Sequence, residues 1–266
     1  MADVLNYQAQ AAAGYDGMFA QVTTHFAPNL LRAACLTPAM DVLDIATGTG
    51  LVAAAALDLI GPTGRLTAAD LSPAMAEKAR ERLGHCSNAS VAVEDAQALS
   101  FPDASFDAVI CSLGLMFFPD PQRGLAEFHR VLRPGGRAAV SVNTVPERSY
   151  NTRINLAIAR YLPSLADAAS RVFSLGSEMK LRSLFEAANF RDVQITTQTR
   201  TFRLPSFDAY FAPIEQGAGS PGQAFVSLPE TARRAVREEL RRELGDAGGP
   251  IEVEVEYRFA SGLRQG

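Results

Sequence analysis

The sequence predicts an α/β fold: a doubly wound, seven-stranded, mostly parallel sheet with an antiparallel last strand and helical caps. Strand-like and helix-like patterns alternate over residues 41–143, which is typical of strands joined by crossover helices. The interiors of the strand-like runs in this region are apolar rather than alternating, as expected for parallel strands that are covered on both faces. Two later runs, 192–202 and 251–259, alternate polar and apolar residues, which favours a half-exposed antiparallel pair.

The elements of the first region can be assigned in order along the chain. Ser72 is a suitable N-cap, and Pro73 suits the first turn of the helix that follows. Pro134-Gly135-Gly136 ends a later helix, because proline and glycine interrupt helical geometry. The expected strands are 41–46, 65–69, 89–94, 106–112 and 137–143, and the expected helices between them are 49–60, 73–83 and 122–132.

Two later segments fall outside this alternation. Residues 145–176 have the pattern of one or two helices, and residues 206–248 hold at least two. One of these, 231–244, is dense in arginine and glutamate, which is typical of a solvated helix with ion pairs along it; a docking surface is the alternative. A further helix, 177–189, precedes the strand 192–202.

Composition and charge indicate a folded enzyme rather than a disordered, secreted or nucleic-acid-binding chain. The 266 residues are 47% hydrophobic and 20% charged, and the net charge is −4 without a long Lys/Arg run. The cysteines Cys35, Cys86 and Cys111 have no paired spacing, so we expect neither a disulfide framework nor a metal site. No signal-peptide core and no apolar run of membrane length are present. We therefore expect a cytoplasmic protein with no metal, no membrane span and no nucleic-acid partner.

The stretch from Val42 to Gly50 carries the most information about function. An apolar run with one acidic residue, Asp44, leads into a small-residue loop and then into an alanine-rich helix. Gly48 and Gly50 lack a Cβ atom, so the backbone can turn sharply and approach a ligand closely. The free N–H groups at the start of the helix point toward that ligand. The pattern predicts a cofactor that contains a nucleoside.

The loop alone does not identify the cofactor. Gly48, Gly50 and Ala53 fit the dinucleotide fingerprint G-x-G-x-x-G/A, and Asp70 lies 20 positions after Gly50. Asp44, however, would repel a pyrophosphate and attract a cationic amino-acid group. A nicotinamide-dependent oxidoreductase is therefore kept only as a remote alternative.

Four segments in a fixed order extend the argument to about 100 residues. They are VLDIATGTG at 42–50, AADLSPAM at 68–75, VEDAQALSFPDASFDAVICSLGLMFFPDP at 93–121 and EFHRVLRPGGRAAVSV at 127–142. With them the chain resembles the class I S-adenosylmethionine (SAM)-dependent methyltransferases, above all the ubiquinone/menaquinone C-methyltransferase type and its small-molecule relatives. Ala46 stands where such enzymes usually carry the first glycine of the loop, a departure that keeps a small residue against the ligand.

The resemblance implies a Rossmann-like fold and a single SAM-dependent methyltransferase domain over residues 1–266. Its expected parts are an N-terminal helical cover at 1–40, a SAM-binding core at 41–143, and helical cap insertions at 145–176 and 206–248.

The resemblance also assigns roles to individual residues. Asp70 would accept both ribose hydroxyls, with helix capping as its alternative role. Leu71 and Met75 would contact the adenine and ribose unless they are ordinary core residues. Asp95 would accept a hydrogen bond from the adenine amino group, and the Ala96 N–H would reach a ring nitrogen. For Asp95, a turn-forming aspartate is the alternative.

The methionine part of SAM would lie against Asp44 and the loop 46–50, because an acid beside an ammonium group favours both charges. A structural acid at the strand end is the alternative for Asp44. S-adenosylhomocysteine is the expected product. The expected SAM-binding residues are Asp44, Ala46, Thr47, Gly48, Gly50, Asp70, Leu71, Met75, Asp95, Ala96 and Ser112.

The acceptor would lie next to the end of the fourth strand, near Ser112. The sequence lacks the Asn/Asp-Pro-Pro-aromatic tetrad that DNA amino-methyltransferases carry there, which argues against a nucleic-acid base as the acceptor. Phe19, Leu113 and Phe117 would line an apolar pocket, with ordinary core as the alternative. The preceding Cys111 is expected to be a buried thiol rather than a nucleophile.

Methyl transfer needs a protein base only when the acceptor is protonated in its resting form. His25 and Tyr15, both in the N-terminal cover, are the candidate catalytic residues. A structural or surface role is the alternative for His25.

The sequence thus predicts methyl transfer from SAM to a small, apolar or aromatic metabolite, with O- or C-methylation favoured over N-methylation. The alternative is a SAM-binding protein of this fold that catalyses another reaction or only binds. The expected partner is a small-molecule methyl acceptor, and a homodimer is an open alternative to a monomer.

Overall fold

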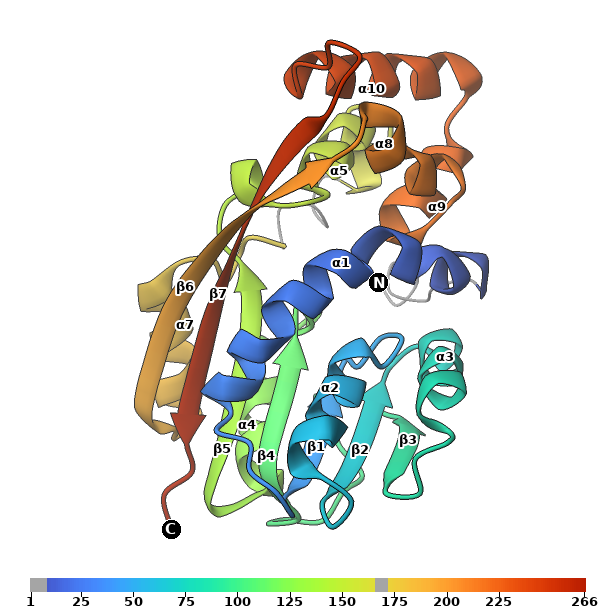
Figure 1. Ribbon diagram of the computed structural model, residues 1–266. Coiled ribbons are helices and arrows are strands. Elements are labelled where there is room, and N and C mark those ends of the chain that lie inside the picture. The colour runs from blue at the N-terminus through green and yellow to red at the C-terminus, as the bar shows by residue number, and fades with distance from the viewer. Residues whose placement is uncertain (1–8, 166–171) are drawn as a thin grey trace.

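A computed structural model of the chain describes residues 9–165 and 172–266 (Figure 1). Residues 1–8 of the expected cover and 166–171 of the first expected cap lie outside the described residues. Within the described residues, no helix combines the length and the apolar character needed to cross a bilayer.

Seven strands of the described chain form one sheet, in the order β3-β2-β1-β4-β5-β7-β6. β1 to β5 are parallel to one another, and β7 lies between β5 and β6 and is antiparallel to both. The predicted mostly parallel sheet with an antiparallel last strand is confirmed. The strands are β1 (Asp41–Ile45), β2 (Arg65–Asp70), β3 (Ala89–Val93), β4 (Phe106–Ser112), β5 (Leu132–Asn143), β6 (Arg191–Leu204) and β7 (Ile251–Leu263).

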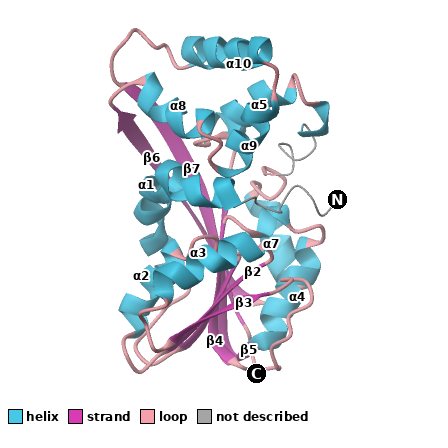
Figure 2. Ribbon diagram, turned by 90° about the vertical axis from the view of Figure 1, so that its right-hand side faces the viewer, coloured by secondary structure: helices cyan, strands magenta, loops and turns pink. Residues whose placement is uncertain are grey.

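Helices cover both faces of the sheet and build a cap beyond its carboxyl edge (Figures 1 and 2). The buried residues of α1 and α2 pack on one face, and those of α4 and α7 pack on the other. The α-helices are α1 (Ala9–Ala33), α2 (Leu51–Ile60), α3 (Pro73–Leu83), α4 (Pro121–Val131), α5 (Thr152–Ala159), α7 (Glu178–Ala187), α8 (Phe207–Glu215), α9 (Gly219–Ser227) and α10 (Glu230–Glu243). The 3-10 turns are η1 (Leu115–Phe117), η2 (Pro146–Arg148) and η3 (Pro163–Leu165).

Capping residues determine where the core helices begin. The Ser72 hydroxyl accepts a hydrogen bond from the Met75 N–H at 3.4 Å, so the predicted N-cap of α3 is confirmed. Asp120 caps α4 in the same way by accepting from the Arg123 N–H at 3.1 Å. These caps hold the helix starts beside the carboxyl ends of the strands.

The structure corrects the expected start of β5. α4 ends before the Pro134-Gly135-Gly136 turn, as predicted, but strand pairing resumes already at Leu132 instead of residue 137. The register shifts between Phe106 and Ala108, which accommodates the turn inside the strand. Local residue types predicted the interruption, whereas the pairing partner decided where the strand begins.

The two C-terminal strands also differ from the expected half-exposed pair. β6 is the edge strand and is largely exposed, but β7 lies between two strands and its second half is buried. The ladder between β6 and β7 runs from Arg191↔Leu263 to Leu204↔Ile251, whereas β7 leaves β5 at Tyr257. The two strands therefore extend past the carboxyl edge as a two-stranded arm (Figure 1).

This arm carries the cap. α8, α9 and α10 lie between β6 and β7 in the sequence and stack with α5, which follows β5 (Figure 2). The Tyr210 hydroxyl of α8 donates to the Tyr150 carbonyl at 2.6 Å and joins the two cap segments. The described helices α5, α8, α9 and α10 thus form one helical layer beyond the carboxyl edge (Figure 2).

Candidate active site

The strand order reverses between β1 and β4, and the loops after β1 to β4 all emerge at the same edge of the sheet. Open parallel sheets bind ligands at such a reversal, outside the carboxyl ends of the strands. The glycine loop is tied to β2 there, because the Thr47 N–H donates to the Ala69 carbonyl at 3.1 Å and the Gly48 N–H donates to Asp70 Oδ2 at 2.8 Å. The predicted loop and the predicted ribose-binding acid are therefore in direct contact.

The two glycines of the loop have different surroundings. Gly48 has φ +57°, and a Cβ placed on it would meet no atom within 4 Å. Gly50 has φ +80° and packs on α3, where a Cβ would lie 3.3 Å from Ala79 Cα. Gly48 therefore borders open space that a ligand can use, whereas Gly50 allows α3 to approach the loop closely.

Ala46, the departure from the glycine pattern, also has a left-handed backbone, with φ +54°. Its methyl group occupies the space where a Cβ of Gly114 would stand, 2.4 Å away. The residue of the loop after β4 that faces Ala46 is Gly114, which has no side chain. The methyl group of Ala46 therefore fits between the two loops and leaves the ligand side of the glycine loop open.

Asp44 is fully buried under the loop, with an exposed fraction of 0%. Its Oδ2 accepts from the Thr47 hydroxyl at 2.6 Å, and within the described residues Oδ1 has no hydrogen-bond partner. Burial, opposed in part by the Thr47 hydrogen bond, raises the pKa of Asp44 from 3.8 to about 7. A buried acid with an unused oxygen fits the cationic group of a ligand.

Asp70 is the second acid of this edge. Its Oδ1 accepts from the Ser72 N–H at 2.9 Å and its Oδ2 from the Gly48 N–H, which fixes the carboxylate without filling all of its lone pairs. Burial raises the pKa of Asp70, while these two hydrogen bonds lower it. The carboxylate is thus held in place and retains acceptor capacity for hydroxyl groups.

The side chains expected around the adenine differ in exposure. Leu71 is 53% exposed and open to a ligand, whereas Met75 is 2% exposed and packs inside the protein. Val93, at the end of β3, is 45% exposed and was not expected from the sequence. Asp95 accepts from the Gln97 N–H at 2.9 Å through Oδ1, which is the turn role that was its alternative; beside it Ala96 is buried.

The end of β4 is joined to β5 through Ser141. The Leu113 N–H donates to the Ser141 carbonyl at 3.0 Å, and the Ser112 and Ser141 hydroxyls lie 3.4 Å apart. Cys111 is buried, and loss of solvation is the first cause that raises its pKa to about 12. The thiol therefore stays protonated, in agreement with its predicted structural role.

The comparisons with known proteins agree with this geometry. The family model described as a methyltransferase domain matches residues 42–136. The ubiquinone/menaquinone biosynthesis C-methyltransferase UbiE of Shewanella halifaxensis is 32% identical over 184 residues, which cover 64% of this chain and 73% of that protein. UbiE of Teredinibacter turnerae is 39% identical over 115 residues, 42% of this chain and 46% of that protein.

The chain belongs to the class I SAM-dependent methyltransferases. It is a SAM-dependent methyltransferase, and SAM is its cofactor. Two solved structures share its fold. Phosphoethanolamine N-methyltransferase 2 of Haemonchus contortus, in complex with phosphomonomethylethanolamine and S-adenosylhomocysteine, has a TM-score of 0.66 and 17% identity and covers 99% of this chain and 60% of that one. The YcgJ protein of Bacillus subtilis has a TM-score of 0.60 and 19% identity and covers 91% and 99%.

The two catalytic candidates of the methyltransferase lie in different places on α1. Tyr15 stacks near Phe19, with ring centroids 4.7 Å apart, in the half of α1 that reaches the glycine loop. His25 is exposed and packs edge-on against Phe26 and Phe202 at 5.0 and 5.6 Å. At 1.5 Å per residue, His25 is about 15 Å further along the helix than Tyr15. A catalytic role for either residue stays a prediction, and the two side chains lie at different points along α1.

One contact of the methyltransferase site was missed by the sequence analysis. Asp16 of α1 accepts a hydrogen bond from the Thr49 hydroxyl in the glycine loop at 2.6 Å, and it pairs with Arg82 of α3. The partners are separated by 33 and 66 residues along the chain, and no local pattern signals such a pairing. Only the packing of α1 over the loop reveals it.

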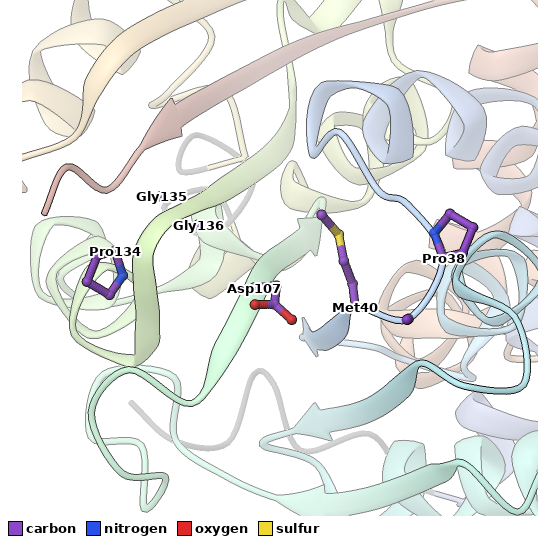
Figure 3. A pocket seen from close by; sticks show the side chains of 7 residues that line it. Pro38, Met40, Asp107, Pro134, Gly135 and Gly136 are labelled. Carbon is purple, nitrogen blue, oxygen red and sulfur yellow. The ribbon is translucent and has the colours of Figure 1, made fainter.

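Two depressions in the described surface lie at the opposite, amino-terminal edge of the sheet. One, of about 310 Å³, is lined by seven residues, six of which Figure 3 labels: Pro38, Met40, Asp107, Pro134, Gly135 and Gly136. Its only acid, Asp107, forms an ion pair with Arg133 at 2.8 Å. The acid that lines this depression is therefore already paired, unlike Asp44.

Proposed function

We propose that this methyltransferase transfers the SAM methyl group to a small apolar or aromatic metabolite, with O- or C-methylation favoured, at the carboxyl edge of the sheet. The observation that carries the placement is the buried, unpartnered Oδ1 of Asp44 beside the open space at Gly48. A cationic amino-acid group next to Asp44 would satisfy this oxygen and favour its charged form.

The remaining SAM contacts follow from the same edge. Asp70 would accept from the ribose hydroxyls, because its carboxylate is already oriented by two backbone N–H groups. Leu71 and Val93 are exposed apolar side chains suited to the faces of an adenine. Asp95 is exposed and its Oδ1 is engaged in the turn, so Oδ2 is the oxygen offered to the adenine amino group.

The acceptor would bind between the glycine loop, α1 and the cap. Phe19 of α1 lies between Tyr15 and Tyr150, with ring centroids 4.7 and 6.4 Å away, so aromatic side chains connect the cover to the cap. Phe117, after β4, is 37% exposed on the same edge. These rings support an apolar or aromatic acceptor, and they support one domain in which cover, core and caps enclose a common site.

When bound, SAM supplies the activated methyl on its sulfonium, so this chain has to hold the acceptor in line and exclude water. The exposed position of His25 supports a mechanism without a histidine base. Tyr15, close to the glycine loop, would then position the acceptor or the cofactor rather than titrate.

A panel of acceptors tests the proposal. Incubation with methyl-labelled SAM and matched phenols, enols, thiols and amines should give O- or C-methylated products from the aromatic compounds. Methylation confined to the amines would overturn the proposed acceptor class. In the same assay His25→Ala should keep kcat within about twofold, whereas loss of a base typically costs 10² or more and is partly recovered at high pH.

A further inference from the structure

α1 contacts two parts of the methyltransferase that are far apart in the sequence. Toward the cap, a Cβ on Gly14 would lie 2.9 Å from the Ala218 Cβ, and a Cβ on Gly219 would lie 3.1 Å from a ring carbon of Phe19. The helix therefore touches α9 and its N-cap with no space for larger side chains. Toward the sheet, the same stretch of α1 reaches the glycine loop through Asp16.

Asp16 closes a ring of contacts among three elements. Its Oδ1 accepts from the Thr49 hydroxyl at 2.6 Å, and its Oδ2 pairs with an Arg82 Nη atom. The Arg82 Nε–H donates in turn to the Thr49 carbonyl at 2.7 Å. Cover, glycine loop and α3 are thus joined at one point, through the side chain of Asp16 and both the side chain and the backbone of Thr49.

This ring differs from an ordinary surface ion pair. Thr49 is buried, and it belongs to the loop between Gly48 and Gly50. An isolated exposed ion pair contributes little, because both side chains are mobile and solvated. Asp16 also accepts a short hydrogen bond from a buried hydroxyl, and charge-assisted hydrogen bonds of this kind are the stronger class.

We propose that Asp16 is a positioning residue for methyl transfer. It holds α1 on the glycine loop and thereby sets Tyr15 and Phe19 relative to both the cofactor and the cap. Both oxygens of Asp16 already bind protein groups, so its role is to hold these elements together. The inference rests on the proposed placement of SAM at the glycine loop. SAM release and acceptor turnover then depend on the same contact, because one helix covers the loop and borders the cap.

Two variants remove the contact from opposite sides. Asp16→Ala removes the acceptor on α1, and Thr49→Val removes the hydroxyl while the Thr49 carbonyl bonded to Arg82 stays in place. Each should raise the SAM dissociation rate about tenfold and lower kcat by a similar factor. The double variant should be no worse than Asp16→Ala, because both changes delete one interaction.

Asp103→Ala is the matched control. Asp103 is an exposed aspartate that pairs with Arg130 at 2.7 Å, away from the carboxyl edge. It should leave SAM release and kcat unchanged. Wild-type SAM release should quicken with added salt, and Asp16→Ala should lose part of this salt dependence because the ion pair is gone. A purely structural role would lower Tm in Asp16→Ala without altering SAM release below Tm.

Hydrogen exchange of residues 14–22 in the ligand-free protein separates this proposal from the placement of SAM. Faster exchange in Asp16→Ala and Thr49→Val than in Asp103→Ala supports the proposal that Asp16 holds α1 on the glycine loop. This result does not depend on which residues bind SAM. Unchanged exchange would overturn the inference. Faster exchange with SAM release and kcat both within twofold of wild type would overturn it as well. If SAM affinity survives Asp70→Ala, the placement of SAM is wrong, and that result is independent of the exchange data.

Discussion

Asp41 and Asp44 lie three residues apart, at the two ends of β1. Their surroundings shift the pKa of the carboxyl group in opposite directions. Asp41, at the amino end, pairs with Arg65 at 2.7 Å and with Arg133 at 2.8 Å. Hydrogen bonding to Arg65 is the first cause that lowers its pKa to about 2. Asp44, at the carboxyl end, accepts from the Thr47 hydroxyl, its Oδ1 has no hydrogen-bond partner in the described part of the chain, and burial raises its pKa to about 7.

The difference supports the proposed placement of the site at the carboxyl edge and a structural role for the acids of the amino edge. A carboxylate that the protein itself neutralises contributes to folding, whereas a buried carboxylate left without a full set of partners costs stability. Such a cost is found where a ligand supplies the missing partner. The amino edge therefore provides matched controls for the carboxyl edge: Gly135 for Gly48, Asp107 for Asp70, and Asp41 for Asp44.

The largest effect is expected at Gly48. Gly48 and Gly135 have φ of +57° and +84°, and at both a Cβ would meet no protein atom within 4 Å. Gly48→Val and Gly135→Val should therefore lose similar stability from backbone strain, on the order of 1–3 kcal/mol. Only Gly48→Val should lose SAM binding, by at least about 100-fold, because the valine enters ligand space. Calorimetry with SAM, beside thermal melts of both variants, checks this. Equal SAM affinity in the two variants would remove the loop from the site.

Asp70 comes next. Asp70→Ala should weaken SAM binding by about 2–4 kcal/mol, since two charge-assisted hydrogen bonds to ribose hydroxyls are lost. Asp107→Ala is the control, because Asp107 also accepts a backbone N–H, that of Asp41 at 2.8 Å, but at the amino edge. It should lower stability without changing SAM affinity. A folded Asp70→Ala that binds SAM like wild type would exclude Asp70 from cofactor binding.

The two acids of β1 should give opposite pH dependences of stability. The folded-state pKa of Asp44 is about 7, above 3.8, so its burial costs stability as pH rises from about 4 through 7. Asp44→Asn should therefore keep about 2–4 kcal/mol of unfolding free energy that ligand-free wild type loses between pH 4 and pH 8. It should also bind SAM more weakly at pH 8.

For Asp41 the sign is reversed. Its folded-state pKa is lowered to about 2, so its contribution is present above about pH 4 and is lost as pH falls toward 2. Asp41→Asn should be less stable than wild type at neutral pH and bind SAM normally. Urea titrations at several pH values measure both slopes, and parallel curves for wild type and Asp44→Asn would contradict the proposed cost at Asp44.

The smallest effect is expected at Asp95. Asp95→Ala should weaken SAM binding by about 1–2 kcal/mol, because a single neutral amine donor is lost. SAM affinity measured beside that of Asp103→Ala, another exposed aspartate, isolates the adenine contact from a general change of surface charge. An unchanged affinity would leave Asp95 with its observed role in the turn alone, where Oδ1 accepts from the Gln97 N–H.

Local sequence patterns were sufficient for most of the core. Apolar runs predicted β1 to β4 to within a residue at each end, and Ser72 with Pro73 predicted the start of α3. These features depend on neighbouring residues, because strand periodicity, helix caps and turns are short-range. The ordered motifs also predicted the methyltransferase family, which the relatives confirm.

Contacts between distant segments were not predictable in this way. The burial of β7 between β5 and β6, the packing of His25 against Phe202 and the contact of Asp16 with Thr49 all depend on packing between segments far apart in the chain. A single sequence does not indicate which acidic side chain accepts a hydrogen bond from which distant donor.

Local sequence patterns were enough to predict a doubly wound sheet with a glycine loop after its first strand, because periodicity, small residues and turn chemistry are local properties. Tertiary structure alone decided which acids remain available. Asp41 and Asp44 are the same residue type on the same strand, and they differ because the charged Arg65 and Arg133 pair with Asp41, whereas Asp44 accepts from the neutral Thr47 hydroxyl.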